Sequence, residues 1–158
     1  MKVILVCKSV SHGNTARIAQ AMSQVLGGRV VDPADIDPAE LADCDLVGFG
    51  SGIFNMSFHP DLRRFIAALP TRQHRKAFVF RTSGLPETPF RRYVTTLTRS
   101  LEHKGFEVID SFGCRGFDTV MPLRLVGGIH KSHPDAADIA AARAFAENLR
   151  VQITTPPF

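Results

Sequence analysis

Short apolar runs recur along the chain and predict the strands of a buried sheet. Valine, isoleucine and phenylalanine dominate in four of these runs, and charge is rare within them: Val3–Cys7, Leu46–Phe49, Ala77–Phe80 and Phe106–Ile109. Continuous apolar runs of this length are typical of strands buried on both faces, as in a parallel sheet covered by helices. A weaker run, Arg29–Val31, adds a fifth predicted strand.

Between these runs, apolar positions repeat with the period of a helix. Ile18, Met22 and Leu26 share one face of a helix that Gly27 is expected to end. The same pattern predicts three more helices, around residues 62–69, 90–101 and 139–149, the last opened by Pro134 with Asp135 and Asp138 at its positive end. Alternating strands and helices predict an α/β fold with right-handed crossovers, in a single domain over residues 1–150 with a tail over 151–158.

Composition narrows the class of protein. A chain of 158 residues, 44% apolar and 22% charged, is about one globular domain. Its three cysteines, Cys7, Cys44 and Cys114, form no C-x-x-C pair, which favours a reducing, cytoplasmic location over a disulfide framework. The apolar run near the N-terminus is too short for a signal peptide, and none is long enough for an integral membrane segment.

The segment 114–134 departs from the regular alternation. It exceeds the roughly 12–15 residues usual for a loop in a compact domain. Its apolar content is consistent either with a packed cover over the edge of the sheet or with a surface for a substrate or partner, and both readings stay open. His130 and His133 precede the predicted last helix and so do not share a helical face, and no metal site is predicted.

The candidate chemistry begins where the first strand ends. Ser9-Val10-Ser11-His12-Gly13-Asn14-Thr15 joins that strand to a helix, and small hydroxyl residues with a glycine at a helix N-terminus are suited to binding an anion. The alternative is a simple helix cap by Asn14 or Thr15.

Three rival families fail on a required residue. A P-loop needs lysine where Asn14 stands. A small tyrosine phosphatase with Cys7 as nucleophile needs an arginine at the position of Gly13, and a receiver domain needs an aspartate where the third strand ends, at Phe49-Gly50.

Two further strands also run into small polar residues, Gly50-Ser51-Gly52-Ile53-Phe54-Asn55 and Thr82-Ser83-Gly84. In open α/β sheets the ligand lies beyond the carboxyl ends of the strands. Phe54 or Phe58 would offer an aromatic face to a planar ring there.

These three segments resemble the flavodoxin family. The resemblance implies a flavodoxin-like three-layer sandwich with a five-stranded parallel sheet of order 2-1-3-4-5 and a bound FMN cofactor. Carried over by position, the first loop would hold the FMN phosphate, the second would lie along the isoalloxazine ring, and the third would meet its polar edge through backbone groups. The implied cofactor-binding residues are Ser9, Ser11, His12, Gly13, Asn14 and Thr15, then Ser51, Gly52, Ile53, Phe54 and Asn55, then Thr82, Ser83 and Gly84.

The chain also departs from that family. His12 stands where a hydroxyl residue is usual, tryptophan is absent, and Tyr93 falls in a predicted helix, so the common Trp/Tyr sandwich around the flavin is missing.

The charge pattern is a further departure. Electron-carrying flavodoxins are typically acidic, whereas this chain has a net charge of +4. Lys and Arg dominate between Arg72 and Lys104, and only acids occur between Asp32 and Asp45. The pattern indicates either two solvated faces of opposite sign or a surface for a negatively charged partner, such as a phosphorylated nicotinamide, an acidic protein or a membrane surface. No motif indicates nucleic-acid binding.

Three functions follow as hypotheses. The first is an FMN-binding flavoprotein that carries electrons to a redox partner protein or small-molecule electron acceptor. The second is an FMN-dependent oxidoreductase, a reductase or oxidase acting on a quinone-like or porphyrin-like substrate. The third is a non-redox binding module with a decayed flavin site. No catalytic residue is assigned, because the cofactor would carry the electrons.

Overall fold

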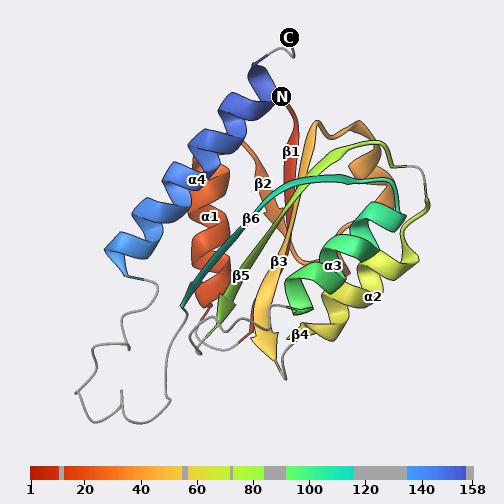
Figure 1. Ribbon diagram of the computed structural model, residues 1–158, viewed down its shortest axis with the longest axis horizontal. Coiled ribbons are helices and arrows are strands. Elements are labelled where there is room, and N and C mark those ends of the chain that lie inside the picture. Colours follow the sequence, from red (N-terminus) through yellow and green to blue (C-terminus); the bar gives the residue numbers. More distant parts are fainter. Residues whose placement is uncertain (11–12, 55–56, 72, 84–91, 116–134, 156–158) are drawn as a thin grey trace.

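The structure is a computed structural model that describes residues 1–10, 13–54, 57–71, 73–83, 92–115 and 135–155. Its centre is a sheet of five parallel strands in the order β2-β1-β3-β5-β6 (Figure 1). A two-residue strand, β4 (Ser57–Phe58), pairs antiparallel with the end of β3. The parallel strands are β1 (Val3–Lys8), β2 (Arg29–Val31), β3 (Leu46–Phe54), β5 (Lys76–Ser83) and β6 (Glu107–Arg115). The predicted order is confirmed, β5 and β6 being the fourth and fifth parallel strands.

Helices cover both faces of this sheet. α1 (Asn14–Leu26) and α4 (Ala136–Thr154) lie together on one face, and α2 (Pro60–Ala68) and α3 (Arg92–His103) lie on the other (Figure 1). Two short 3-10 turns, η1 (Pro33–Asp35) and η2 (Pro38–Asp43), connect β2 to β3. The predicted three-layer sandwich is therefore confirmed.

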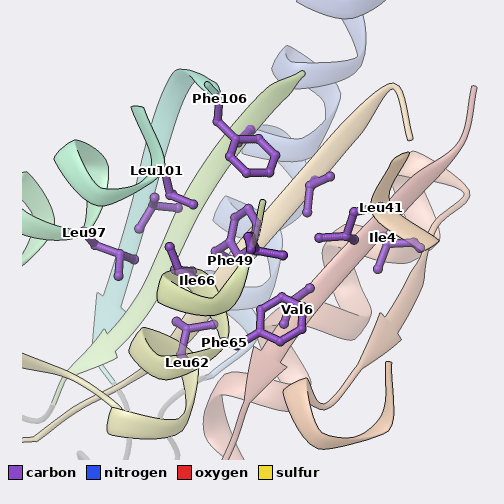
Figure 2. Close-up of a cluster of buried hydrophobic side chains, with 14 of the residues drawn as sticks. Ile4, Val6, Leu41, Phe49, Leu62, Phe65, Ile66, Leu97, Leu101 and Phe106 are labelled. Atoms are coloured by element: carbon purple, nitrogen blue, oxygen red, sulfur yellow. The ribbon is translucent and has the colours of Figure 1, made fainter. Parts of the chain in front are cut away.

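Each face of the sheet has its own apolar core. On the α2–α3 face, Phe49 of β3 is fully buried and its ring meets Phe106 edge-on, with ring centroids 5.3 Å apart (Figure 2). On the α1–α4 face, Phe78 and Phe80 of β5 pack with Ile18 of α1. Burial on both sides explains why the strands are uninterrupted apolar runs.

The strands extend further than the apolar runs predicted. Gly50–Phe54, expected to be a loop, continues β3, and the pairs Gly50↔Phe80 and Gly52↔Thr82 extend its ladder to β5. Cys114, expected to begin a loop, lies in β6 opposite Thr82. These expectations were wrong because ladder hydrogen bonds come from the backbone, so small polar residues continue a strand wherever a neighbouring strand is present to pair with them. Residues 116–134, with His130 and His133, lie outside the described residues.

The last helix also continues past its expected end. α4 runs to Thr154, so residues 151–154 are helical where a tail was expected. Ile153 is partly buried against the α1–α4 core, which extends the apolar face beyond Leu149.

The acidic stretch after β2 is largely structural. The Asp32 and Asp37 carboxylates cap η1 and η2, and Glu40 completes a capping box. Glu40 also pairs with Arg29 at 3.2 Å, and Asp45 accepts a hydrogen bond of 2.7 Å from the backbone N–H of Lys2. These acids therefore stabilise local turns and strand ends.

Candidate functional site

The carboxyl ends of β1, β3 and β5 lie side by side at one edge of the sheet. Lys8 pairs with Ser51, which in turn pairs with Arg81. The three predicted loops therefore leave the sheet next to one another, since neighbouring strands are about 4.8 Å apart.

A buried hydrogen bond joins the first and third of these segments. The Oγ1 atoms of Thr15 in α1 and Thr82 in β5 are 2.7 Å apart, and both residues are at most 5% exposed. Each hydroxyl carries one hydrogen and the bond uses only one of the two, so the accepting hydroxyl still has a hydrogen to donate. Two residues that the sequence assigned to different parts of a cofactor site are thus in direct contact.

The described residues at the N-terminus of α1 are compatible with a bound anion. Gly13 is the N-cap, with a left-handed φ of 65°, and no acidic residue occurs in the first turn. The Ser9 hydroxyl accepts a hydrogen bond of 3.2 Å from the Ala16 N–H. Neither Asn14 nor Thr15, the alternative caps, occupies the cap position, because Gly13 precedes both. The positive end of the helix dipole therefore faces the sheet edge without a carboxylate of this turn to neutralise it.

At the end of β3, some groups are used within the fold and others lie accessible at the edge of the sheet. The Ser51 hydroxyl is buried, donating to the Gly52 carbonyl at 2.7 Å and accepting from the His59 N–H at 3.0 Å, so it links β3 to the start of α2. Gly52 and Ile53 are half-buried at the edge. Phe58 is 1% exposed, with its ring 6.1 Å from that of Tyr93, and belongs to the core.

Several predicted site residues cannot be compared with this geometry. Ser11, His12, Asn55 and Gly84 lie outside the described residues, as do the side chains of Phe54 and Ser83. Their contacts with a cofactor stay predictions.

Arg81 is a component of this edge that sequence reasoning missed. It is 3% exposed, directly before Thr82, and its guanidinium carbon lies 5.8 Å from the centre of the Tyr93 ring. Gly113 of β6 makes room for it, because a Cβ there would lie 2.5 Å from the same carbon. The available signal was an arginine that interrupts an apolar strand immediately before the small polar residues.

Lys8 ends β1 in a cluster of charges. Its Nζ atom lies 3.3 Å from an Asp61 carboxylate oxygen and 3.4 Å from one of Asp32. The hydrogen bond to Asp61 and the charge of Asp32 raise the pKa of Lys8. Hydrogen bonds from Arg64, then from Lys8, lower the pKa of Asp61. The positive charge of Lys8 is thus balanced by two carboxylates within the fold.

All three cysteine thiols have a raised pKa. Burial, reinforced by the charge of Asp32, raises the pKa of Cys7 to about 12, and burial likewise raises that of Cys114 to about 12. Burial also raises the pKa of Cys44. Because the thiolate is the reactive form, the raised pKa of Cys7 argues against a nucleophilic role at neutral pH, in agreement with the missing arginine.

The described residues show neither a cluster of metal ligands nor a membrane-spanning helix. Within the described ranges, no group of three or more His, Cys, Asp and Glu side chains could hold a metal ion. In that same part of the chain, no helix is both long and apolar enough to cross a membrane.

Comparison with known proteins agrees with this geometry. The fold and the three strand ends define a flavodoxin-like protein. The model of one family, described as a flavodoxin domain, matches residues 5–116, and the chain belongs to that family. A relative from Methanocaldococcus jannaschii, itself an uncharacterized protein, is 33% identical over 151 residues, covering 94% of this chain and 98% of that protein.

Solved structures share the fold at low sequence identity. Oxidised flavodoxin 2 from Bacillus cereus matches with a TM-score of 0.72 and 17% identity, covering 96% of this chain and 99% of that one. An NADH:FMN oxidoreductase in its apo form matches with a TM-score of 0.69 and 20% identity, covering 99% and 91%. Both matches extend over nearly the whole chain.

Proposed function

We propose that this protein binds FMN non-covalently at the carboxyl edge of its sheet and transfers electrons in the cytoplasm to a redox partner protein or small-molecule acceptor. The observation that carries the proposal is the buried Thr15–Thr82 hydrogen bond, which connects the proposed phosphate loop to the proposed ring edge. Membership of the flavodoxin-domain family supports the choice of cofactor.

The described residues fit such a group. The first turn of α1 has no acid to repel a phosphate, and the Thr15–Thr82 pair retains one hydrogen for an acceptor. Ser9, Gly13, Asn14 and Thr15, with Ser11 and His12, would bind the phosphate. Bound FMN would supply the redox chemistry, and the protein would position it and set the charge around it.

At the ring, Gly52 and Ile53, with Phe54 and Asn55, would lie along one side. Thr82, Ser83 and Gly84 would meet the polar edge. Ser51 would act through its backbone or by holding the end of β3, since its hydroxyl is already used within the fold.

A second candidate is an FMN-dependent reductase or oxidase acting on a quinone-like or porphyrin-like substrate. Arg81 favours it, because a buried cation beside the ring edge would stabilise negative charge on a reduced flavin. The similarity to an NADH:FMN oxidoreductase over 99% of the chain is consistent with it.

Reconstitution with FMN, read by flavin absorbance and by titration, tests the binding. Asn14→Asp places a negative charge beside the proposed phosphate and should weaken FMN binding about tenfold or more. Gln24→Glu is the matched control, because it makes the same change of charge at the other end of α1 and should leave the affinity unchanged.

Absence of binding at micromolar FMN would overturn the proposal in favour of a non-redox binding module. Equal effects of the two variants would show that the FMN phosphate does not bind at the N-terminus of α1. If FMN binds, two measurements separate the remaining candidates. Two resolved one-electron steps in a potentiometric titration favour the carrier. Catalytic oxidation of NADH or NADPH by a quinone in a turnover assay favours the enzyme.

A further inference from the structure

A groove lies between α2 and α3, on the sheet face opposite α1. Two cavities, of about 320 Å³ and 530 Å³, share Arg63, Ile66, Thr96 and Ser100 in their linings and therefore form one continuous depression. Its first end is lined by Phe58 of β4, and its second by residues at the carboxyl end of α3. The groove is thus distinct from the proposed phosphate loop before α1.

Among the described residues, the cations that line the groove have no acidic counterpart. Arg63, Arg99 and Lys104 line the larger cavity, and no aspartate or glutamate is among the described residues lining either one. Arg63 donates from Nε to the Phe58 carbonyl at 3.1 Å, and Lys104 donates from Nζ to the Ala67 carbonyl at 3.0 Å. In the part of the chain that the structure describes, none of the three cations has a carboxylate within 4.0 Å.

These anchors leave the cations available to a ligand. The backbone bond uses only one donor of each group, so Arg63 keeps its two Nη groups and Lys104 keeps two hydrogens. Backbone carbonyls orient the side chains without cancelling their charge. Cations from two helices therefore share one depression, an arrangement that favours a multiply charged anion.

The other residues that line the groove indicate which kind of anion would fit it. Ala67 is exposed and provides an apolar surface above the buried Ile66, while Thr96 and Ser100 add hydroxyls. The volume of the larger cavity is within the roughly 300–1,000 Å³ of small-molecule sites, and a concave depression of this size is smaller than a protein interface requires. An apolar body carrying phosphates matches both the surface and the charge.

We propose that the α2–α3 groove is a second binding site, which takes a phosphorylated nucleotide with its phosphates against Arg63, Arg99 and Lys104. The site is independent of FMN binding, because it shares no residue with the proposed flavin-binding set. A failure of the FMN proposal therefore leaves this one standing, and the reverse also holds.

Calorimetric titration of the full chain, without added flavin, tests the site, with ADP and inorganic pyrophosphate as probes. Both should bind one to one, ADP more tightly because its base and ribose contact the apolar surface. Arg99→Gln should weaken ADP about tenfold, since it removes one charge-assisted contact from an exposed helical position where the fold does not depend on it. Arg143→Gln on α4 is the matched control, with the same loss of charge outside the groove, and should leave binding unchanged.

Four results would overturn the proposal. They are no ADP binding at millimolar concentration, equal losses in the Arg99→Gln and Arg143→Gln variants, a loss in Asn14→Asp without a loss in Arg99→Gln, and tighter binding of poly-L-glutamate that displaces ADP. The second would indicate general attraction to a basic chain, the third binding at the α1 loop, and the fourth a site for an acidic polypeptide.

Discussion

Gly50 decides how two neighbouring strands pack. It lies in β3 opposite Phe80 of β5, and a Cβ at Gly50 would be 2.2 Å from the nearest atom of the Phe80 ring. The ring is fully buried in the core of the α1–α4 face. The glycine therefore matters for the space it leaves, which explains why it stands inside a strand where glycine is otherwise unfavourable.

We expect Gly50→Ala to lower the free energy of unfolding by about 1–3 kcal/mol, the usual cost of overpacking a core. Urea unfolding measures the loss. In a Phe80→Leu background the smaller side chain makes room, so the same substitution should cost less. Strictly additive losses would show that the contact is not responsible.

Cys7 gives the protein a specific sensitivity to alkaline pH. Its pKa rises from about 9 to about 12 on folding because the thiol is buried. Below pH 9 the thiol is protonated in both states, so its contribution to stability is complete. Between about pH 9 and 12 only the unfolded chain loses the proton, and stability falls with pH.

The expected slope from this one thiol is about −1.4 kcal/mol per pH unit within that window. Unfolding curves from pH 8 to 11 should therefore fall less steeply for Cys7→Ala than for the unchanged chain, whatever the offset between the two proteins at pH 8. Parallel curves would contradict the burial of a neutral thiol.

Among the helices and strands, a buried hydrogen bond connects α1 to β5. Thr15 and Thr82 are 67 positions apart in the chain and meet through their hydroxyls on the α1–α4 face. Because both are buried, loss of one partner leaves a polar group without a hydrogen bond, which costs more than the bond itself contributes.

Thr82→Val keeps the shape of the side chain but removes its hydroxyl, and it should destabilise the fold by about 1–3 kcal/mol. The double variant Thr15→Val/Thr82→Val removes both polar groups and should recover most of that loss. Thermal or urea unfolding measures both. A double variant as unstable as the sum of its single changes would rule out the buried pair as the cause.

At the scale of the whole molecule, the two sheet faces are used differently. The α1–α4 face contributes the helix whose N-terminus faces the proposed FMN phosphate, while the α2–α3 face has the cationic groove. The charge pattern read from the sequence thus has local uses in the described residues. Several of the acids cap turns, and two of the cations line a cavity.

If FMN binds only the folded protein, it should stabilise the whole domain. At a concentration one hundred times its Kd the gain is about 2.7 kcal/mol, which corresponds to a rise in Tm of roughly 5–10 °C for a chain of this size. Riboflavin lacks the phosphate and should raise Tm less at the same concentration. Equal shifts for the two flavins would argue against a phosphate site at the α1 loop.

The limits of sequence reasoning differ between the fold and the site. The helices were predictable where apolar periodicity and a terminating glycine coincide, as at Ile18 to Gly27, because these signals are local. Strand ends were not, because residues 50–52 of β3 pair through backbone groups supplied by β5, a distant segment. Arg81 was overlooked because its burial depends on Gly113, on a neighbouring strand.

Patterns along the chain were enough to predict the class of fold, the strand order implied by the family resemblance and the three segments of the candidate site. Apolar runs and their spacing specify which faces must be buried, and burial on both faces of every central strand leaves few arrangements. The packed layers were needed to show that Thr15 meets Thr82, that the Ser51 hydroxyl is used within the fold, and that three cations share one groove. Those contacts join residues far apart in the chain, so they exist only once the layers have packed.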